Sequence, residues 1–445
     1  MRPARTSPAG FVGTGSRPAV RPDGYLPSGQ RLRAQDELLC YLLLAGLLLT
    51  YGEIGRGLLF NPLRAGGAEE PYAFLANYAR YLQIIGTIAV AALGGAASIG
   101  RPLRLMTPLL PFAIVSALTL IWSVDREFTA RYSILLFGLL VISAFLVDRL
   151  GPVRVVKGVL HFLAFLMIVS LIVALLWPVV GRHDPSDLAE LGHVGRWRGI
   201  FAHKNALGAY AAFAAVLLFT HSHLIKGGFV YLWIARICAL VCLAMSGSST
   251  AVFGVVVLLL TYVMFIRRQL AHPIVLMFVF VFAVLAFQFL SSEMVAEWLG
   301  RDATFSGRTE IWRAAIGIWS EQPLGGYGYS AATAWVLAPT LTEALFTSAI
   351  DAHNAYIDVL LDCGLLGLGA LLFGILVGLW RGYVGALTLE GPQRSATIAL
   401  LMLVLGNCAM AMGEVSPFRI VGNGGYLLFL ASVALCYSYR RMPRH

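Results

Sequence analysis

The sequence predicts an all-α protein that crosses a lipid bilayer about twelve times. Of its 445 residues, 58% are hydrophobic and only 13% are charged. The mean hydropathy is +0.77. Apolar runs near the roughly 20 residues that a helix needs to cross the hydrocarbon core recur along most of the chain. These observations are typical of a polytopic membrane protein and exclude a soluble globular domain.

The individual spans follow from the apolar runs, read in chain order against a tolerated length of about 17 to 25 residues. The predicted spans are Leu38–Tyr51, Tyr81–Ala97, Leu105–Trp122, Tyr132–Val147, Val159–Val180, Ala206–Leu224, Phe229–Met245, Thr250–Ile266, Pro273–Leu290, Tyr356–Leu379, Ala396–Met412 and Val421–Tyr437. Residues 1–35 are rich in Pro, Gly, Ser and Arg and lack the apolar core of a signal peptide. We expect them to form a disordered basic tail.

The distribution of Lys and Arg predicts that both termini lie in the cytoplasm. With the amino terminus inside, more than half of the 33 Lys and Arg residues fall in inner segments, as the positive-inside rule requires. The net charge of +10 therefore sets orientation and does not indicate a nucleic-acid partner. The six cysteines lie in or beside apolar runs without metal-ligand spacing, so they are interpreted as buried small hydrophobic residues.

Two outer segments divide the chain under this topology. Residues 36–290 would hold helices one to nine, with 181–205 as a short functional outer loop. Residues 291–355 would form a large outer loop, and 356–445 the last three helices and a short cytoplasmic tail. Most connections in compact proteins have about 4 to 6 residues. A loop as long as 291–355 is therefore expected to be partly structured and functional.

An amphipathic helix is predicted at Gly307–Ser320, inside the long loop. Ile311, Ala315 and Trp319 recur there at helical spacing, and Ser306 is a suitable N-cap. A Pro-Leu-Gly-Gly sequence follows and should end the helix. Because the helix places tryptophans on its apolar face, we expect it to lie on the membrane surface or against the bundle.

Basic residues gather around three predicted helix starts on the outer side, at His203–Asn205, Ser306–Arg308 and Asp351–Asn354. Unpaired backbone N–H groups and the helix dipole favour an anion there, and Arg binds phosphate oxygens in a bidentate manner. The cations concerned are Arg196, Arg198, Lys204, Arg301 and Arg308. Any single Arg could instead contact phospholipid head groups or pair with Asp302 or Glu310. As a set, they predict a site for a phosphate or pyrophosphate carried on a membrane lipid.

His353 is the candidate general base, because an imidazole titrates near the working pH and a helix N-terminus favours its neutral form. Its alternative role is that of a hydrogen-bonded residue at the start of the tenth span. His203 competes for the catalytic role, but beside Lys204 it could equally bind an anion or lock the loop. Asn205 and Asn354 are predicted helix caps.

The remaining polar motifs are interpreted as structural. Asp125 and Arg131 form a smaller outer group beside Trp122, and Gly325–Gly328 resembles a phosphate-binding loop but follows no strand, so we interpret it as a turn. The outer loops contain no HExxH sequence and no carboxylate cluster at metal-ligand spacing. The sequence therefore predicts chemistry without a metal or another cofactor.

Four motifs in order along the chain resemble those of one superfamily. They are Arg198–Gly208, Gly307–Trp312, Pro323–Gly328 and Ala352–Tyr356. With the Trp122–Asp125 element, they resemble the O-antigen ligase and Wzy-type polymerase superfamily (Wzy_C). Within it, the chain looks most similar to exopolysaccharide polymerases of the ExoQ kind.

The resemblance implies a bacterial inner-membrane glycosyltransferase of the GT-C type, with its active site and large loop in the periplasm. Its donor would be a glycan on undecaprenyl pyrophosphate, and its acceptor a glycan or lipid-linked molecule. By motif position, Arg198, Arg308 and His353 would be catalytic. The predicted substrate-binding residues are Arg196, His203, Lys204, Asn205, Arg301, Glu310, Trp312, Asn354 and Tyr356. Other polysaccharide assembly proteins are possible partners.

Several functions remain open at this stage. The leading hypothesis is metal-independent, inverting polymerisation of lipid-linked repeat units. A ligase that transfers finished glycan to lipid A core or another acceptor would use the same donor and the same cations. A transporter or flippase should instead place ionisable groups along a path near the midplane, where Asp358, Asp362 and Arg236 are the exceptions to consider. A noncatalytic scaffold would not need Arg308 or His353.

Overall fold

The computed structural model describes residues 34–51, 71–93, 96–183, 193–267, 306–345, 351–413, 418 and 425–440. Regular structure in these ranges is helical, apart from one isolated bridge between Arg182 and Trp197. The α-helices are α1 (Ala34–Tyr51), α3 (Pro71–Leu93), α4 (Ala96–Met106), α5 (Leu110–Leu118), α6 (Arg126–Leu176), α7 (Pro178–Gly181), α8 (Lys204–Thr220), α9 (Phe229–Ser246), α10 (Ser249–Ile266), α13 (Ser306–Glu321), α14 (Ala338–Leu345), α15 (Ala355–Thr388), α16 (Gly391–Met410) and α17 (Gly425–Arg440). The predicted all-α class is confirmed.

Six helical stretches in the described part of the chain are long and apolar enough to cross a membrane. They are Gly100–Ile121, Arg126–Leu176, Phe229–Ser246, Ser249–Ile266, Ala355–Thr388 and Gly391–Met410. Shorter apolar helices cover Glu37–Tyr51, Lys204–Thr220 and Gly425–Tyr437. The predicted span Pro273–Leu290 lies outside the described residues. The count of twelve spans and the GT-C type therefore stay predictions.

α6 contains the predicted span Tyr132–Val147 and most of the predicted span Val159–Val180, which extends beyond the end of α6 at Leu176. Gly151 interrupts it with φ 74° and ψ 161°, and Pro152 follows. Glycine adopts this positive φ without a steric penalty, and proline has no backbone N–H to continue the ladder. The two halves of α6 on either side of this break correspond to the two predicted spans.

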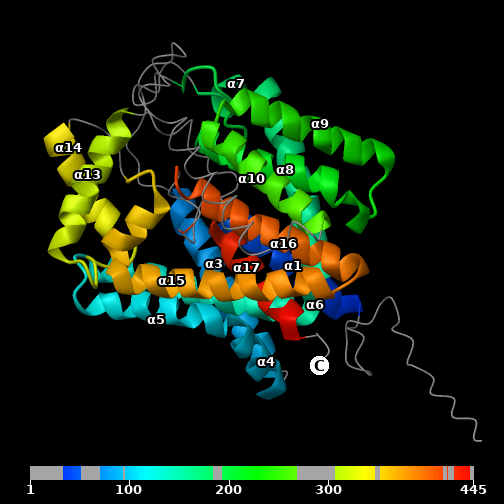
Figure 1. Ribbon diagram of the computed structural model, residues 1–445, viewed down its shortest axis with the longest axis horizontal. Helices are drawn as coiled ribbons and strands as arrows, with labels where there is room; N and C mark the ends of the chain where they lie inside the picture. The colour runs from blue at the N-terminus through cyan, green and yellow to red at the C-terminus, as the bar shows by residue number, and fades with distance from the viewer. Residues whose placement is uncertain are drawn as a thin grey trace, which may run out of the picture.

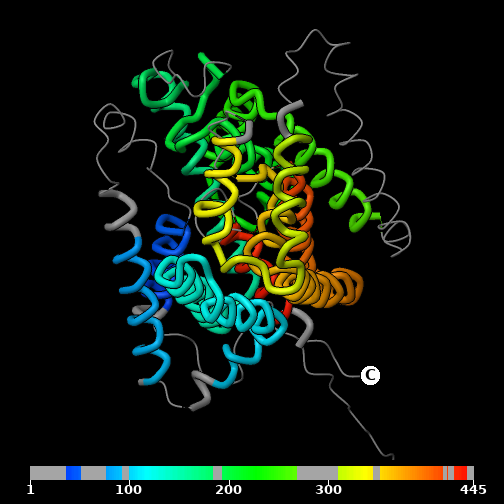
Figure 2. Tube along the Cα trace, turned by 90° about the vertical axis from the view of Figure 1, so that its left-hand side faces the viewer, coloured from blue at the N-terminus to red at the C-terminus, as the bar shows by residue number. Residues whose placement is uncertain are grey.

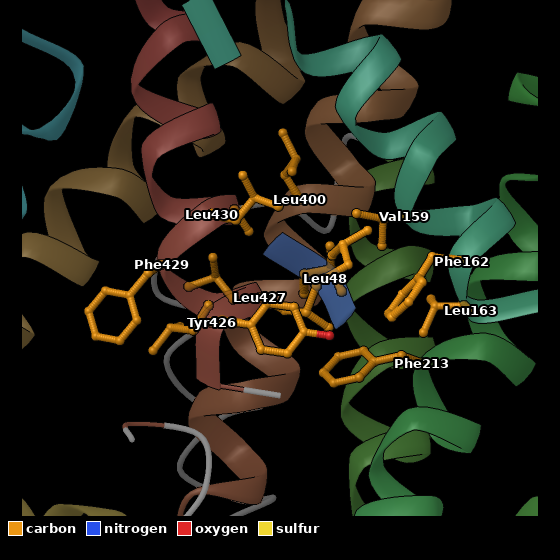
Figure 3. Close-up of a cluster of buried hydrophobic side chains, with 14 of the residues drawn as sticks. Leu48, Val159, Phe162, Leu163, Phe213, Leu400, Tyr426, Leu427, Phe429 and Leu430 are labelled. Atoms are coloured by element: carbon orange, nitrogen blue, oxygen red, sulfur yellow. The ribbon is translucent and has the colours of Figure 1, made fainter. Parts of the chain in front are cut away.

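The main apolar core lies where α6, α8, α16 and α17 meet. Figure 3 shows Phe162 of α6, Phe213 of α8, Leu400 of α16 and Tyr426 of α17 gathered in this region. The hydroxyl of Tyr210 donates to that of Tyr426 at 2.9 Å, which gives both groups a partner inside the core. Packing of these large side chains holds the four helices together.

The helices differ in how far they face outward. Within its most apolar stretch, 78% of α16 is buried, compared with 28% of α9. Phe229, Ile234 and Ile237 of α9 are exposed. Large exposed apolar surfaces are unfavourable in water but suit a helix that faces lipid tails. α16 is therefore central in the bundle, whereas α9 is peripheral.

Helix direction determines which loops lie together. α16 runs antiparallel to α10, because Arg394 at the start of α16 donates to the carbonyl of Phe265 near the end of α10. At the opposite end, Met410 of α16 packs against Gly254 of α10. The start of α10 and the end of α16 consequently share one end of the bundle.

The starts of α8 and α15 lie at this same end. Gly208 in the first turns of α8 packs so closely against α10 that an added Cβ would lie 2.7 Å from Cβ of Ser248. The N–H of Ala355, the first residue of α15, donates to the carbonyl of Ala411, just after α16, at 2.9 Å. The segments that precede α8 and α15, which hold the polar motifs, therefore lie at one end of the molecule.

α13 and α14 cover the beginning of α15 at this end (Figure 1). Figure 2 looks onto them and shows both helices in front of the bundle. α13 confirms the amphipathic helix predicted at Gly307–Ser320. Ile311 and Ala315 are buried in a second apolar cluster with Tyr327 and Leu361, so α13 lies against the bundle.

α15 is interrupted at Gly364, which has φ 63° and ψ −165°. The loop 322–328 fills this gap. N–H groups of the loop donate to α15 carbonyls before the break, and α15 N–H groups after the break donate to carbonyls of the loop. These bonds run from Tyr327 to Leu361 (2.8 Å), Gly328 to Asp362 (2.9 Å), Leu365 to Pro323 (2.9 Å) and Leu366 to Leu324 (3.2 Å). Backbone groups freed by the break are thus satisfied within the protein, as a membrane-spanning helix requires.

The early outer segment around Trp122 docks on the same loop. Trp122 Nε1 donates to the carbonyl of Gly326 at 3.1 Å, and Val124 N–H donates to that of Tyr327 at 3.0 Å. Asp125 caps α6 by accepting from Phe128 N–H at 2.9 Å. The structural interpretation of this segment agrees with these contacts, which connect α5 and α6 to the loop.

Candidate functional site

The segment Asp351–Asn354 directly precedes α15 and is held in place by hydrogen bonds. The side chain of Asn354 accepts from the N–H groups of Tyr356 and Ile357 at 3.1 and 3.4 Å, which confirms the predicted cap. His353 has a positive φ of 48°. Its side chain is 38% exposed, so the imidazole can meet a substrate at the surface of this end of the bundle.

The peptide before His353 is held from two helices. Trp312 Nε1 in α13 donates to the carbonyl of Ala352 at 2.8 Å. The N–H of Ala352 donates to Oδ1 of Asp358 in α15 at 3.2 Å. Because both polar groups of this residue are engaged, the backbone leading into His353 is fixed relative to α13 and α15.

α13 carries one of the predicted cations in its sequence. Arg308 lies in the first turn of α13, and Trp312 follows it by one helical turn. The bond from Trp312 to Ala352 holds this part of α13 against the segment that precedes α15. Glu310 is exposed in the same turn. Arg301, another predicted binding residue, lies outside the described residues.

The far end of α13 is tied to the loop that fills the α15 break. The hydroxyl of Tyr327 donates to the carbonyl of Ile318 at 2.8 Å and lies 3.2 Å from Glu321. Burial, followed by the hydrogen bond to Glu321, raises the pKa of the Tyr327 hydroxyl. The hydroxyl therefore stays protonated at neutral pH and remains a donor. α13 is thus held at Trp312 and again near its carboxyl end.

Arg198 is buried against the chain itself, with a relative exposure of 3%. Its guanidinium donates from Nε to the carbonyl of Val180 at 2.9 Å and from Nη2 to that of Val179 at 3.1 Å. Its backbone N–H donates to Gly181 at 2.9 Å. These contacts fasten the predicted motif to α7. A catalytic role for Arg198 stays a prediction.

Arg196 is the exposed arginine of the pair. Its guanidinium lies over Gly247 in the turn between α9 and α10, where an added Cβ would lie 2.5 Å from Nη1. Between the two arginines, the N–H of Trp197 donates to the carbonyl of Met245 at 3.1 Å. Arg198 is therefore buried in the protein, whereas Arg196 is exposed to the solvent.

Two histidines cap α8. His203 Nδ1 accepts from the N–H of Asn205, and His183 Nε2 accepts from that of Lys204, each at 3.2 Å. The predicted cap at Asn205 was wrong: Asn205 is already inside α8, and the imidazole two residues earlier reaches its N–H. His203, Lys204 and Asn205 are half-buried at this helix start. Their predicted binding roles remain untested by these contacts.

The rings of His183, His193 and His203 lie together, with centroids 5.2 to 5.8 Å apart. In His183 and His203, one ring nitrogen accepts a backbone hydrogen bond, so the ring proton belongs on the other nitrogen. This arrangement suits helix capping. Within the described ranges, no group of three or more His, Cys, Asp or Glu side chains is placed to hold a metal ion.

Part of the chain is similar to known proteins. Residues 234–373 match the family model described as O-antigen ligase. The chain is also 25% identical over 353 residues to the exopolysaccharide production protein ExoQ of Rhizobium meliloti (strain 1021), which covers 74% of this chain and 77% of that protein. The predicted resemblance is confirmed, and it indicates a multi-pass membrane enzyme of the O-antigen ligase or polymerase type.

The stretch that matches the O-antigen ligase family model contains one part of the candidate site and excludes the other. Arg308, Trp312 and His353 lie within the matched residues, whereas the Arg196–Asn205 segment precedes them. Sequence reasoning missed Asp351, Asp358 and His183 as partners in this region. Asp351 could have been found because it lies two residues before His353, but the contacts of Asp358 and His183 depend on how distant segments pack.

Proposed function

We propose that the protein polymerises undecaprenyl-pyrophosphate-linked oligosaccharide repeat units into an exopolysaccharide or O-antigen-like polymer at the periplasmic face of the bacterial inner membrane. The observation that carries this proposal is the bond from Trp312 to Ala352, which ties α13, the helix that carries Arg308, to the peptide before His353. A cation and a base at one end of an apolar bundle suit a donor whose pyrophosphate is held by a membrane lipid.

The chemistry needs few groups because pyrophosphate is already a good leaving group. His353 takes the proton of the acceptor hydroxyl as its oxygen attacks the anomeric carbon. The bond from that carbon to the pyrophosphate oxygen breaks, and undecaprenyl pyrophosphate departs with its electron pair. Arg308 and Arg196 stabilise the developing charge. A single displacement of this kind inverts the anomeric centre and requires no metal.

Polymerase and ligase differ only in the acceptor. Similarity to an exopolysaccharide production protein over most of its length favours the polymerase, in which the acceptor is another lipid-linked glycan. The ligase remains the second candidate because residues 234–373 match the family model described as O-antigen ligase. In that case, the acceptor is lipid A core or another molecule.

The contacts of Asp358 and Arg236 disfavour a transporter. Asp358 accepts from Ala352 N–H. Arg236 donates to the carbonyl of Leu218 and to the hydroxyl of Ser222, at the end of the bundle opposite the candidate site. These side chains support local structure at the two ends of the bundle, whereas a transport path needs them along the midplane.

The undecaprenyl-linked glycan profile tests the proposal. We expect a deletion strain to accumulate single repeat units on the carrier and to lose the polymer, and the wild-type gene to restore it. Accumulation of long polymer on the carrier, without transfer to its final acceptor, would support the ligase instead. An unchanged glycan profile would contradict both reactions.

The paired variants Arg198→Ala and Arg196→Ala separate structural from ligand-binding cations. Arg198→Ala removes a buried charged donor from two carbonyls, so we expect a loss of about 2–4 kcal/mol in the free energy of unfolding. Arg196→Ala should leave the melting temperature nearly unchanged because the side chain is exposed, but it should weaken binding of the lipid-linked donor. Thermal unfolding in detergent and the KM for extracted donor lipid measure the two effects. Equal stability of both variants would contradict this assignment.

A further inference from the structure

Asp351 is a polar neighbour of His353 that the proposed chemistry does not use. Its Oδ1 accepts the backbone N–H of His353 at 3.0 Å and lies 3.3 Å from Nδ1 of the same residue. The Asp351 side chain is 14% exposed, whereas that of His353 is 38% exposed. The carboxylate is therefore the more buried of the two groups, and the imidazole is the more accessible one.

The backbone at His353 is held in an uncommon conformation. A φ of 48° lies in the left-handed region, which side chains other than glycine adopt infrequently, although Asn, Asp and His are enriched there. Trp312 and Asp358 hold the preceding peptide, and Asn354 caps the following helix. Strained backbone fixed by its surroundings occurs often at functional sites. These anchors also keep the segment in place without the charge of Asp351.

We propose that Asp351 is a positioning residue that orients the imidazole of His353 and fixes its tautomer for proton removal. A carboxylate near Nδ1 favours the proton on that nitrogen, so the lone pair of the neutral ring lies on Nε2. When Nε2 takes the proton of the acceptor hydroxyl, the carboxylate stabilises the imidazolium that forms. This inference rests on the proposed function, because it requires His353 to be the base.

The substitution Asp351→Asn isolates this role. The amide oxygen of Asn can still accept the backbone N–H of His353, and the two side chains have nearly the same volume. The amide lacks the negative charge, and its NH₂ group can face Nδ1 and stabilise the opposite tautomer. The fold should therefore persist while the base is lost.

The assay uses the full chain in proteoliposomes, with lipid-linked glycan extracted from the deletion strain as substrate. We expect Asp351→Asn to lower kcat about 100-fold or more, with little change in KM. Added to His353→Asn, it should cause no further loss, because a residue that acts through His353 has no effect once the imidazole is absent. Asp125→Asn is the matched control: it removes one carboxylate charge from a helix cap at another loop and should keep wild-type kcat.

Two results would overturn the inference while the proposed function stands: wild-type kcat for Asp351→Asn beside an inactive His353→Asn variant, or an additive loss in the double variant. Full activity of His353→Asn would overturn it as well. If the wild-type protein does not extend the extracted glycan, that failure counts against the proposed function. The variants are then compared by restoration of the glycan profile in the deletion strain, where the inference still requires Asp351→Asn and His353→Asn to fail alike.

Discussion

Gly364→Ala is expected to leave little folded protein in the membrane. Gly364 has φ 63° and ψ −165°, a region that is essentially restricted to glycine. A Cβ at this position would lie 2.2 Å from the carbonyl oxygen of Leu324 and 2.6 Å from the N atom of Gly325, both backbone atoms of the inserted loop. Relief of this overlap would pull the loop away from the break and leave buried backbone groups without partners. The free energy of unfolding should fall by more than about 4 kcal/mol.

Gly369→Ala is the matched control on the same helix. No heavy atom of the surrounding structure lies within 4 Å of a Cβ added there, and the residue is exposed. Alanine is a better helix former than glycine by up to about 1 kcal/mol, so this variant should be as stable as the wild type or slightly more so. Expression level and melting temperature in detergent measure both variants. Similar melting temperatures for the two would show that the insertion at Gly364 does not stabilise the fold.

The contrast between α13 and α15 explains what the sequence could predict. α13 was predictable because its apolar residues recur at helical spacing and its end is marked by proline and glycine. The break in α15 was not, since the apolar run Tyr356–Leu379 continues through Gly364 without a change in pattern. Its partner is a loop about forty residues earlier in the chain, and periodicity holds no information about such distant contacts.

The same distinction holds for the candidate site. The pattern Arg-Trp-Arg could not tell which arginine faces the solvent, because Arg198 is buried by the carbonyls of Val179 and Val180, which come from a preceding segment. Local preference favoured Asn205 as a cap, yet His203 caps α8. Asn354 was predicted correctly because its side chain reaches N–H groups only two and three residues later.

His353→Asn is expected to abolish most activity while the protein stays folded. Asn tolerates the left-handed backbone of His353, so this variant avoids the strain that Ala would add at φ 48°. It lacks a nitrogen able to take the proton of the acceptor hydroxyl, and removal of a general base typically lowers the rate by about 10²- to 10⁴-fold. The initial rate of glycan extension in proteoliposomes measures the effect, and the melting temperature checks that folding is retained.

A control substitution at a second histidine tests whether the loss of activity is specific to His353. His161→Asn changes an exposed imidazole of α6, whose Nδ1 lies 3.4 Å from the hydroxyl of Tyr231, outside the candidate site. We expect it to keep nearly wild-type activity, so that a loss confined to His353→Asn points to proton transfer and not to a general need for imidazole groups. A scaffold protein would behave differently, because it needs a correct fold and no base. Restoration of normal polymer in the deletion strain by folded His353→Asn protein would therefore exclude catalysis by His353 and favour the scaffold.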